Sequence, residues 1–180
     1  MRTASVTTME PRFAISPYIG EFFCFITSPA YAAPCTLWWT HHTGMMPAAF
    51  HLALVSCCLT AVFSTLYHAT LTKITSSLDA GQAVVTFWLV SLLLCGVTSL
   101  AIHAAAVAVL AAIYARSWRK TATISIILTS FVVPPAMYVL TTKGEAMAAL
   151  VKAKAPIFPG CDIPHYCMSL TVRWVIAAAL

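Results

Sequence analysis

Apolar residues occur along this chain in long blocks, which are separated by short connections of polar residues, prolines and glycines. A block of about 20 apolar residues is the length that an α-helix needs to cross a bilayer. The blocks of this kind, some of them shorter, cover 15–40, 46–68, 82–96, 97–116, 121–142 and 165–180. Segment 143–155 carries charges around an apolar centre, and we expect either a surface helix or a further membrane segment there. The pattern therefore predicts an all-α, polytopic transmembrane helix bundle with six to seven membrane segments.

The breaks between and within these blocks are predicted from prolines and hydroxyl residues. Pro29 and Pro34 should kink the first segment, because proline removes a backbone donor and clashes with the preceding turn. The cluster 75–77, Thr-Ser-Ser, is the expected turn after the second segment. We predict one domain, residues 1–180, with an N-terminal surface segment at 1–14 and the helix bundle at 15–180.

The composition agrees with a membrane protein. Hydrophobic residues make up 61% of the chain and charged residues 8%, whereas a soluble domain carries roughly 25% charged residues. The net charge of +5 is spread over the connections, and no dense basic stripe indicates nucleic acid as a partner. The seven cysteines fall mostly inside apolar blocks, which is typical of free thiols that pack as small apolar residues. The lipid bilayer is thus the first partner that the sequence predicts.

Three polar side chains gather where the second block ends. Ser64 and His68 are four positions apart, so on one helix they share a face. Asp79 follows eleven residues after His68 and can meet it only if a turn intervenes and a new helix begins. Ionisable groups in membrane segments are costly and indicate a function. The alternative interpretation is an exposed connection with an ordinary histidine and aspartate.

Two stretches of the chain carry motifs of one family. One is Ser-x-x-x-His at Ser64 and His68 followed by Leu-Asp at Asp79, and the other is the run Ser-Pro-Tyr-Ile-Gly-Glu-Phe-Phe at 16–23. Together they resemble the alkaline ceramidases, a family of seven-helix zinc membrane hydrolases. By this resemblance, the chain would be a shortened and divergent member of that family. The resemblance implies that His68 binds zinc together with two histidines of the last helix, and that Ser64 and Asp79 are catalytic. It also implies that zinc-bound water attacks the amide of a ceramide.

The chain departs from the family at both of its metal sites. Cys161 and His165 stand at the positions of the last two zinc ligands, and a thiolate is a good zinc ligand, so a site of His68, Cys161 and His165 is chemically allowed. The alternative is that Cys161 is an ordinary loop thiol and that His165 begins a helix.

The second departure concerns the family's calcium site. Glu10 and Glu21 match two of its ligands, but Arg12 stands at a third and brings a positive charge. These three are vestigial calcium-site positions. We expect an ion pair of Arg12 with Glu21 or Glu10, and no calcium.

The sequence leaves open whether the protein is an enzyme. The lost ligands favour a catalytically degenerate, ceramidase-like accessory or structural subunit of a larger, respiratory-type membrane complex, with other membrane subunits as partners. The alternative is an active zinc-dependent amide hydrolase that cleaves ceramide-like lipids to a sphingoid base and a fatty acid. The basic, hydroxyl-bearing start favours an organelle inner membrane, that of the mitochondrion, whereas the resemblance favours the endoplasmic reticulum or Golgi.

Overall fold

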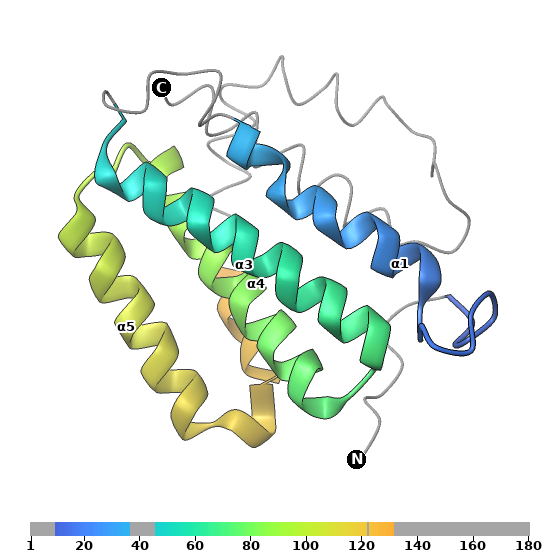
Figure 1. Cartoon of the computed structure of the whole chain (residues 1–180). Coiled ribbons are helices and arrows are strands. Elements are labelled where there is room, and N and C mark those ends of the chain that lie inside the picture. Colours follow the sequence, from blue (N-terminus) through green and yellow to red (C-terminus); the bar gives the residue numbers. More distant parts are fainter. Residues whose placement is uncertain (1–9, 37–45, 122, 132–180) are drawn as a thin grey trace.

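The computed structural model describes residues 10–36, 46–121 and 123–131, and its elements are all helices (Figure 1). In chain order these are α1 (Phe22–Thr27), the 3₁₀ helix η1 (Ser28–Thr36), α3 (Ala48–Thr70), α4 (Lys73–Leu94), α5 (Leu100–Arg116) and the short 3₁₀ turn η3 (Trp118–Lys120), after which 123–131 is again helical. α3 lies in the middle: α1 and η1 run along one side of it, α4 packs on the other, and α5 packs mainly on α4 (Figure 1). The all-α prediction is confirmed.

Two of these helices have the length and apolar composition needed to cross a membrane, namely α3 and α4. α5 is apolar but has only 17 residues. The described residues therefore show two such helices and not six to seven. The predicted segments 143–155 and 165–180, and most of 121–142, lie outside the described residues.

The connection between α3 and α4 is shorter and earlier than predicted. α3 ends because Leu71 adopts the left-handed conformation, with φ of 49°, and its N–H donates to the carbonyl of Tyr67 at 2.7 Å. Thr72 then caps α4, since its hydroxyl accepts from the N–H of Thr75 at 3.2 Å. The turn predicted at 75–77 is thus wrong: these residues form the first turns of α4, which begins well before the predicted 82–96 segment.

The two prolines of the first apolar block lie in the 3₁₀ part of that block. The α-helical geometry of α1 changes to 3₁₀ at Ser28, directly before Pro29, and Pro34 lies inside η1. A 3₁₀ run of nine residues is longer than usual, and Pro29 and Pro34 supply no N–H to an α-helical ladder. From Phe22 to Thr36 the first block is therefore a short α-helix followed by a 3₁₀ helix, both packed on α3.

Hydroxyl and amide side chains join α3 to α4 inside the bundle. The Thr86 hydroxyl lies 2.7 Å from that of Ser56 and 2.8 Å from that of Thr60. Gln82 donates its amide to the Ser56 hydroxyl at 2.7 Å. An apolar cluster that includes Phe50, Leu54, Leu89 and Leu93 continues the same interface. Interhelical hydrogen bonds of this kind hold membrane helices in register, because a lipid environment offers these groups no water.

The irregular segment before α1 is seated against the end of α3. Gly20 donates its N–H to the carbonyl of Ala69 at 3.1 Å, and Glu21 donates to that of His68 at 2.9 Å. These bonds satisfy carbonyls that a helix end leaves without intrahelical partners. A Cβ at Gly20 would lie 2.4 Å from Cγ of Leu71, so only glycine allows this close approach. Gly20 therefore sets where the following Glu21 lies.

Substituting alanine at Gly20 should lower the free energy of unfolding by about 1–3 kcal/mol, the usual cost of overpacking. The penalty should shrink in a Leu71→Ala background, because the clash is with that side chain. Gly81→Ala is the matched control, since its Cβ would meet the Tyr114 ring at an ordinary 3.8 Å. Denaturant titration of the detergent-solubilised variants measures all of these. Equal stability of Gly20→Ala and Gly81→Ala would contradict the seating.

Candidate functional site

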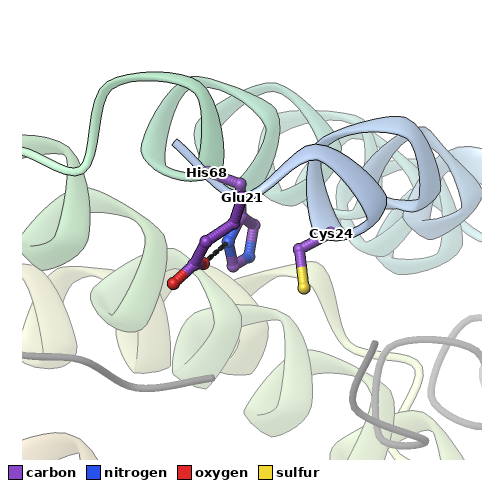
Figure 2. Close-up of side chains that lie close together, drawn as sticks. All are labelled: Glu21, Cys24 and His68. Atoms are coloured by element: carbon purple, nitrogen blue, oxygen red, sulfur yellow. Dashed lines mark hydrogen bonds and ion pairs between the residues drawn. The ribbon is translucent and has the colours of Figure 1, made fainter. Parts of the chain in front are cut away.

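The first feature of the site is a buried contact between Glu21 and His68. Nδ1 of His68 lies 2.6 Å from Oε2 of Glu21, and the side chains are 2% and 0% exposed (Figure 2). The two residues meet because the N–H of Glu21 is bonded to the carbonyl of His68, which brings the start of α1 to the end of α3. A carboxylate and an imidazole buried together share a proton or form an ion pair, and neither group is favourable there alone.

Cys24 adds a third donor atom to this pair. It lies one turn along α1 from Glu21, is fully buried, and lies beside His68 (Figure 2). One ligand atom from each of Glu21, Cys24 and His68 lies within 4.8 Å of the other two. Oxygen, sulfur and nitrogen donors at such separations could hold a metal ion. A metal bound through Nε2 of His68 would leave Glu21 as the carboxylate that orients the ring.

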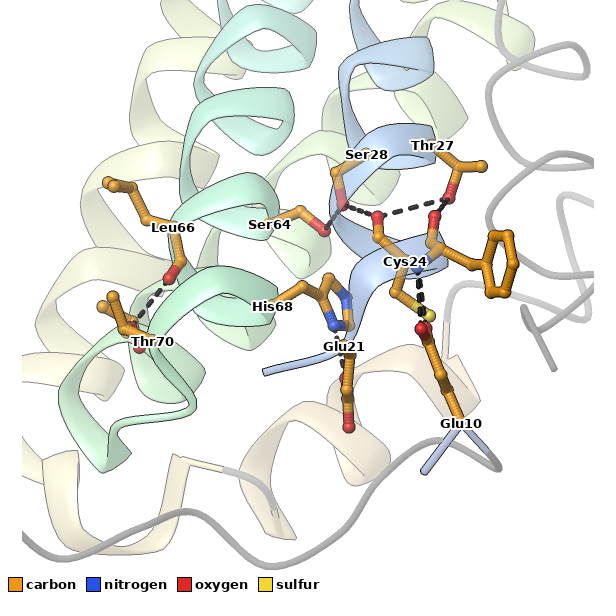
Figure 3. A network of polar contacts seen from close by, with 11 residues as sticks. Glu10, Glu21, Cys24, Thr27, Ser28, Ser64, Leu66, His68 and Thr70 are labelled. Carbon is orange, nitrogen blue, oxygen red and sulfur yellow. Dashed lines mark hydrogen bonds and ion pairs between the residues drawn. The ribbon is translucent and has the colours of Figure 1, made fainter. Parts of the chain in front are cut away.

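Glu10 supports the same region from the N-terminal segment. Its two carboxylate oxygens accept the backbone N–H groups of Phe23 and Cys24, at 2.8 and 3.0 Å (Figure 3). Glu10 is 4% exposed. A carboxylate at this position satisfies amides that the first turn of a helix leaves unbonded, and its charge is favourable at the helix N-terminus. Glu10 thus fixes the backbone that carries Cys24.

Ser64 and Asp79 complete the group. The Ser64 hydroxyl lies 3.0 Å from that of Ser28, which donates to the carbonyl of Cys24 at 2.7 Å (Figure 3). The half-buried carboxyl of Asp79, in the second turn of α4, is hydrogen-bonded to the Ser64 hydroxyl and lies near His68. The structure therefore places Ser64, His68 and Asp79 in one region, at the end of α3 and the start of α4. Their catalytic and metal-binding roles stay predictions.

The remaining predicted residues are placed only in part. Cys161 and His165 lie outside the described residues. Arg12 is described and half-buried, and its ion pair with Glu21 or Glu10 stays a prediction. Cys24 was missed by sequence reasoning, because it lies in an apolar run without a motif. Its one signal is a spacing of three from Glu21, which puts both on one helix face.

Comparisons of this chain with models of protein families, with curated proteins and with solved structures give no match. The resemblance to the alkaline ceramidases accordingly rests on the two motifs.

Proposed function

We propose that this is a ceramidase-like integral membrane protein which has lost catalysis and serves as an accessory, structural subunit of a larger, respiratory-type complex in the mitochondrial inner membrane. The observation that carries the proposal is the use of Glu10. Both of its oxygens bind amides of α1, whereas the resemblance would give this carboxylate to calcium. Glu21, the other acidic match, is in contact with His68. Glu10 and Glu21 match side chains that bind a metal ion in the family, whereas in this chain they make contacts within and between helices.

The exterior of the bundle supports a role among other membrane subunits. Alanines recur at helical spacing along α5 and are exposed there: Ala104, Ala108, Ala112 and Ala115. Small residues let a second helix approach closely, which is how membrane helices associate. α3 and α4 supply two segments able to span a bilayer. With the segments predicted elsewhere in the chain, the proposed bundle has six to seven.

Fractionation followed by native gel electrophoresis tests this proposal. We expect the protein in the inner mitochondrial membrane, migrating with a complex much larger than its own 19.4 kDa. A variant with bulky residues on the exposed face of α5, Ala108→Leu and Ala112→Leu, should migrate apart from the complex. Ala80→Leu, at a half-buried position of α4, is the comparison variant for a bulky residue away from that face. Migration of the parent protein alone, or its recovery in the endoplasmic reticulum or Golgi, would overturn the proposal.

The second candidate is an active zinc-dependent amide hydrolase, and the placement of Ser64 and Asp79 beside His68 favours it. Zinc accepts the donor types present: His68 and Cys24, or His68 with Cys161 and His165. Bound zinc would supply an acidic water as the nucleophile. The Asp79 carboxyl would then hold the proton of that water, and the Ser64 hydroxyl would donate a hydrogen bond to the carbonyl of a ceramide-like amide.

Activity and metal content of the purified protein distinguish the two candidates. For the degenerate subunit we expect no release of fatty acid from ceramide, with or without added zinc. For the hydrolase we expect release of fatty acid from ceramide by the parent protein. Asp79→Asn and Ser64→Ala should abolish this release without changing the melting temperature of the protein. Elemental analysis of the same samples reports whether about one equivalent of zinc accompanies any activity.

A further inference from the structure

A second pair of reactive side chains lies away from Glu21 and His68, where η1 packs on α3. The sulfur of Cys35, in η1, lies 2.9 Å from the sulfur of Cys58, in the middle of α3. Non-bonded carbon atoms pack at about 3.5–4.0 Å, and sulfur is larger than carbon, so these two thiols are in unusually close contact. Cys35 also directs its thiol to the carbonyl of Leu54 at 3.3 Å. The contact joins two segments of the chain that only their packing brings together.

The other cysteines near this point are placed differently. Cys57 is adjacent to Cys58 in the sequence but about 100° around the helix. It is 2% exposed and packs in the apolar cluster with Phe50 and Leu54. Cys35 and Cys58, by contrast, are each half-buried. All the cysteines within the described residues are free thiols, so the structure corresponds to the reduced state of the pair.

We propose that Cys35 and Cys58 are a redox-active pair that closes to a disulfide between η1 and α3. The two S–H bonds break and one S–S bond forms, and two protons and two electrons pass to a two-electron oxidant. Because Cys58 lies at the middle of a helix long enough to span a bilayer, that oxidant is membrane-permeant. With dioxygen as the oxidant, the two hydrogens and half an equivalent of dioxygen become water.

The disulfide would act on the candidate site through η1. α1 leads directly into η1, and it carries Cys24, while Ser28 at the start of η1 contacts Ser64. A covalent bond from Cys35 to α3 therefore holds this face of α1 and η1 against the helix that bears His68. Oxidation makes the arrangement of Glu21, Cys24 and His68 more rigid.

Oxidation of the full-length protein in lipid vesicles tests the proposal. The vesicles are treated with copper phenanthroline and air, remaining thiols are blocked with N-ethylmaleimide, and peptides are analysed by mass spectrometry. We expect the Cys35–Cys58 cross-link to form at least tenfold faster than any cross-link of Cys57. The disulfide closes the loop between Cys35 and Cys58, which should also raise the melting temperature by about 5 °C, and a reductant should reverse the rise.

The variants make each outcome decisive. Cys58→Ala and Cys35→Ala should abolish both the cross-link and the thermal shift, and Cys57→Ala, the matched neighbour, should keep both. Circular dichroism of each variant before oxidation verifies that the helices are retained. Absence of the cross-link in the parent protein, or cross-links of Cys35 with Cys57 at a comparable rate, would overturn the proposal.

Discussion

Replacing His68 by alanine is expected to lower the free energy of unfolding by about 3–5 kcal/mol, the usual cost of removing one partner of a buried pair. The loss is large because Glu21 is fully buried and its carboxylate loses the imidazole that lies 2.6 Å away. The same change also removes a ring that packs against Tyr67, with ring centroids 4.8 Å apart. Denaturant titration in detergent micelles, followed by circular dichroism, measures the effect.

A double-mutant cycle separates the pair from the packing. Glu21→Ala should be costly alone, but in the His68→Ala background it should cost less, since the contact between the two side chains is then already absent. Leu66→Ala is the control on the same helix: Leu66 is 45% exposed, and its loss should change stability by about 0.5 kcal/mol or less. Additive effects of Glu21→Ala and His68→Ala, or a loss for His68→Ala no larger than for Leu66→Ala, would contradict the pairing.

The sequence predicted the helices that are apolar over their whole length. α3 at Ala48–Thr70 and α5 at Leu100–Arg116 lie close to the predicted 46–68 and 97–116, because a continuous apolar block has few other ways to satisfy its backbone. α4 was placed too late. Its first turns are rich in threonine and serine, which favour turns in general, but here Thr72 caps them into a helix.

The turn itself could not have been located from residue preferences. It depends on Leu71 in the left-handed region, which a leucine rarely enters. The conformation is maintained because Leu71 is 1% exposed and packs against Gly20, a residue far away in the sequence. Tertiary packing thus decided a local structure that local rules assign elsewhere.

The candidate site was predictable where it depends on spacing along one helix and not where it depends on docking. Ser64 and His68 share a face of α3, as their separation of four requires. The contact of His68 with Glu21 spans 47 positions and follows from the seating of Gly20 on α3. The resemblance drew attention to both residues but assigned them to different metals. The structure instead places them in one group with Cys24.

The second large effect is expected at Glu10. Replacing Glu10 by alanine removes the acceptors of two backbone N–H groups at the start of α1, and hydrogen bonds to a charged group contribute about 1.5–3 kcal/mol each. We expect the free energy of unfolding to fall by about 3–6 kcal/mol on this basis. Glu10→Gln should fall in between, because the amide keeps one acceptor oxygen and turns a donor towards the second N–H. Tyr18→Ala, in the same segment but 88% exposed, should have little effect.

The response to a calcium chelator distinguishes whether Glu10 acts as a helix cap or as an ion ligand. If it is a cap, a calcium chelator leaves the melting temperature of the parent protein unchanged, and the difference between the parent and Glu10→Ala is the same with and without the chelator. A ligand would behave in the opposite way: the chelator would destabilise the parent and erase its advantage over Glu10→Ala. We expect the first result, because both oxygens of Glu10 already accept amides of α1 at 2.8 and 3.0 Å. The measurement is a thermal melt of both proteins in excess calcium and in excess chelator, at one ionic strength.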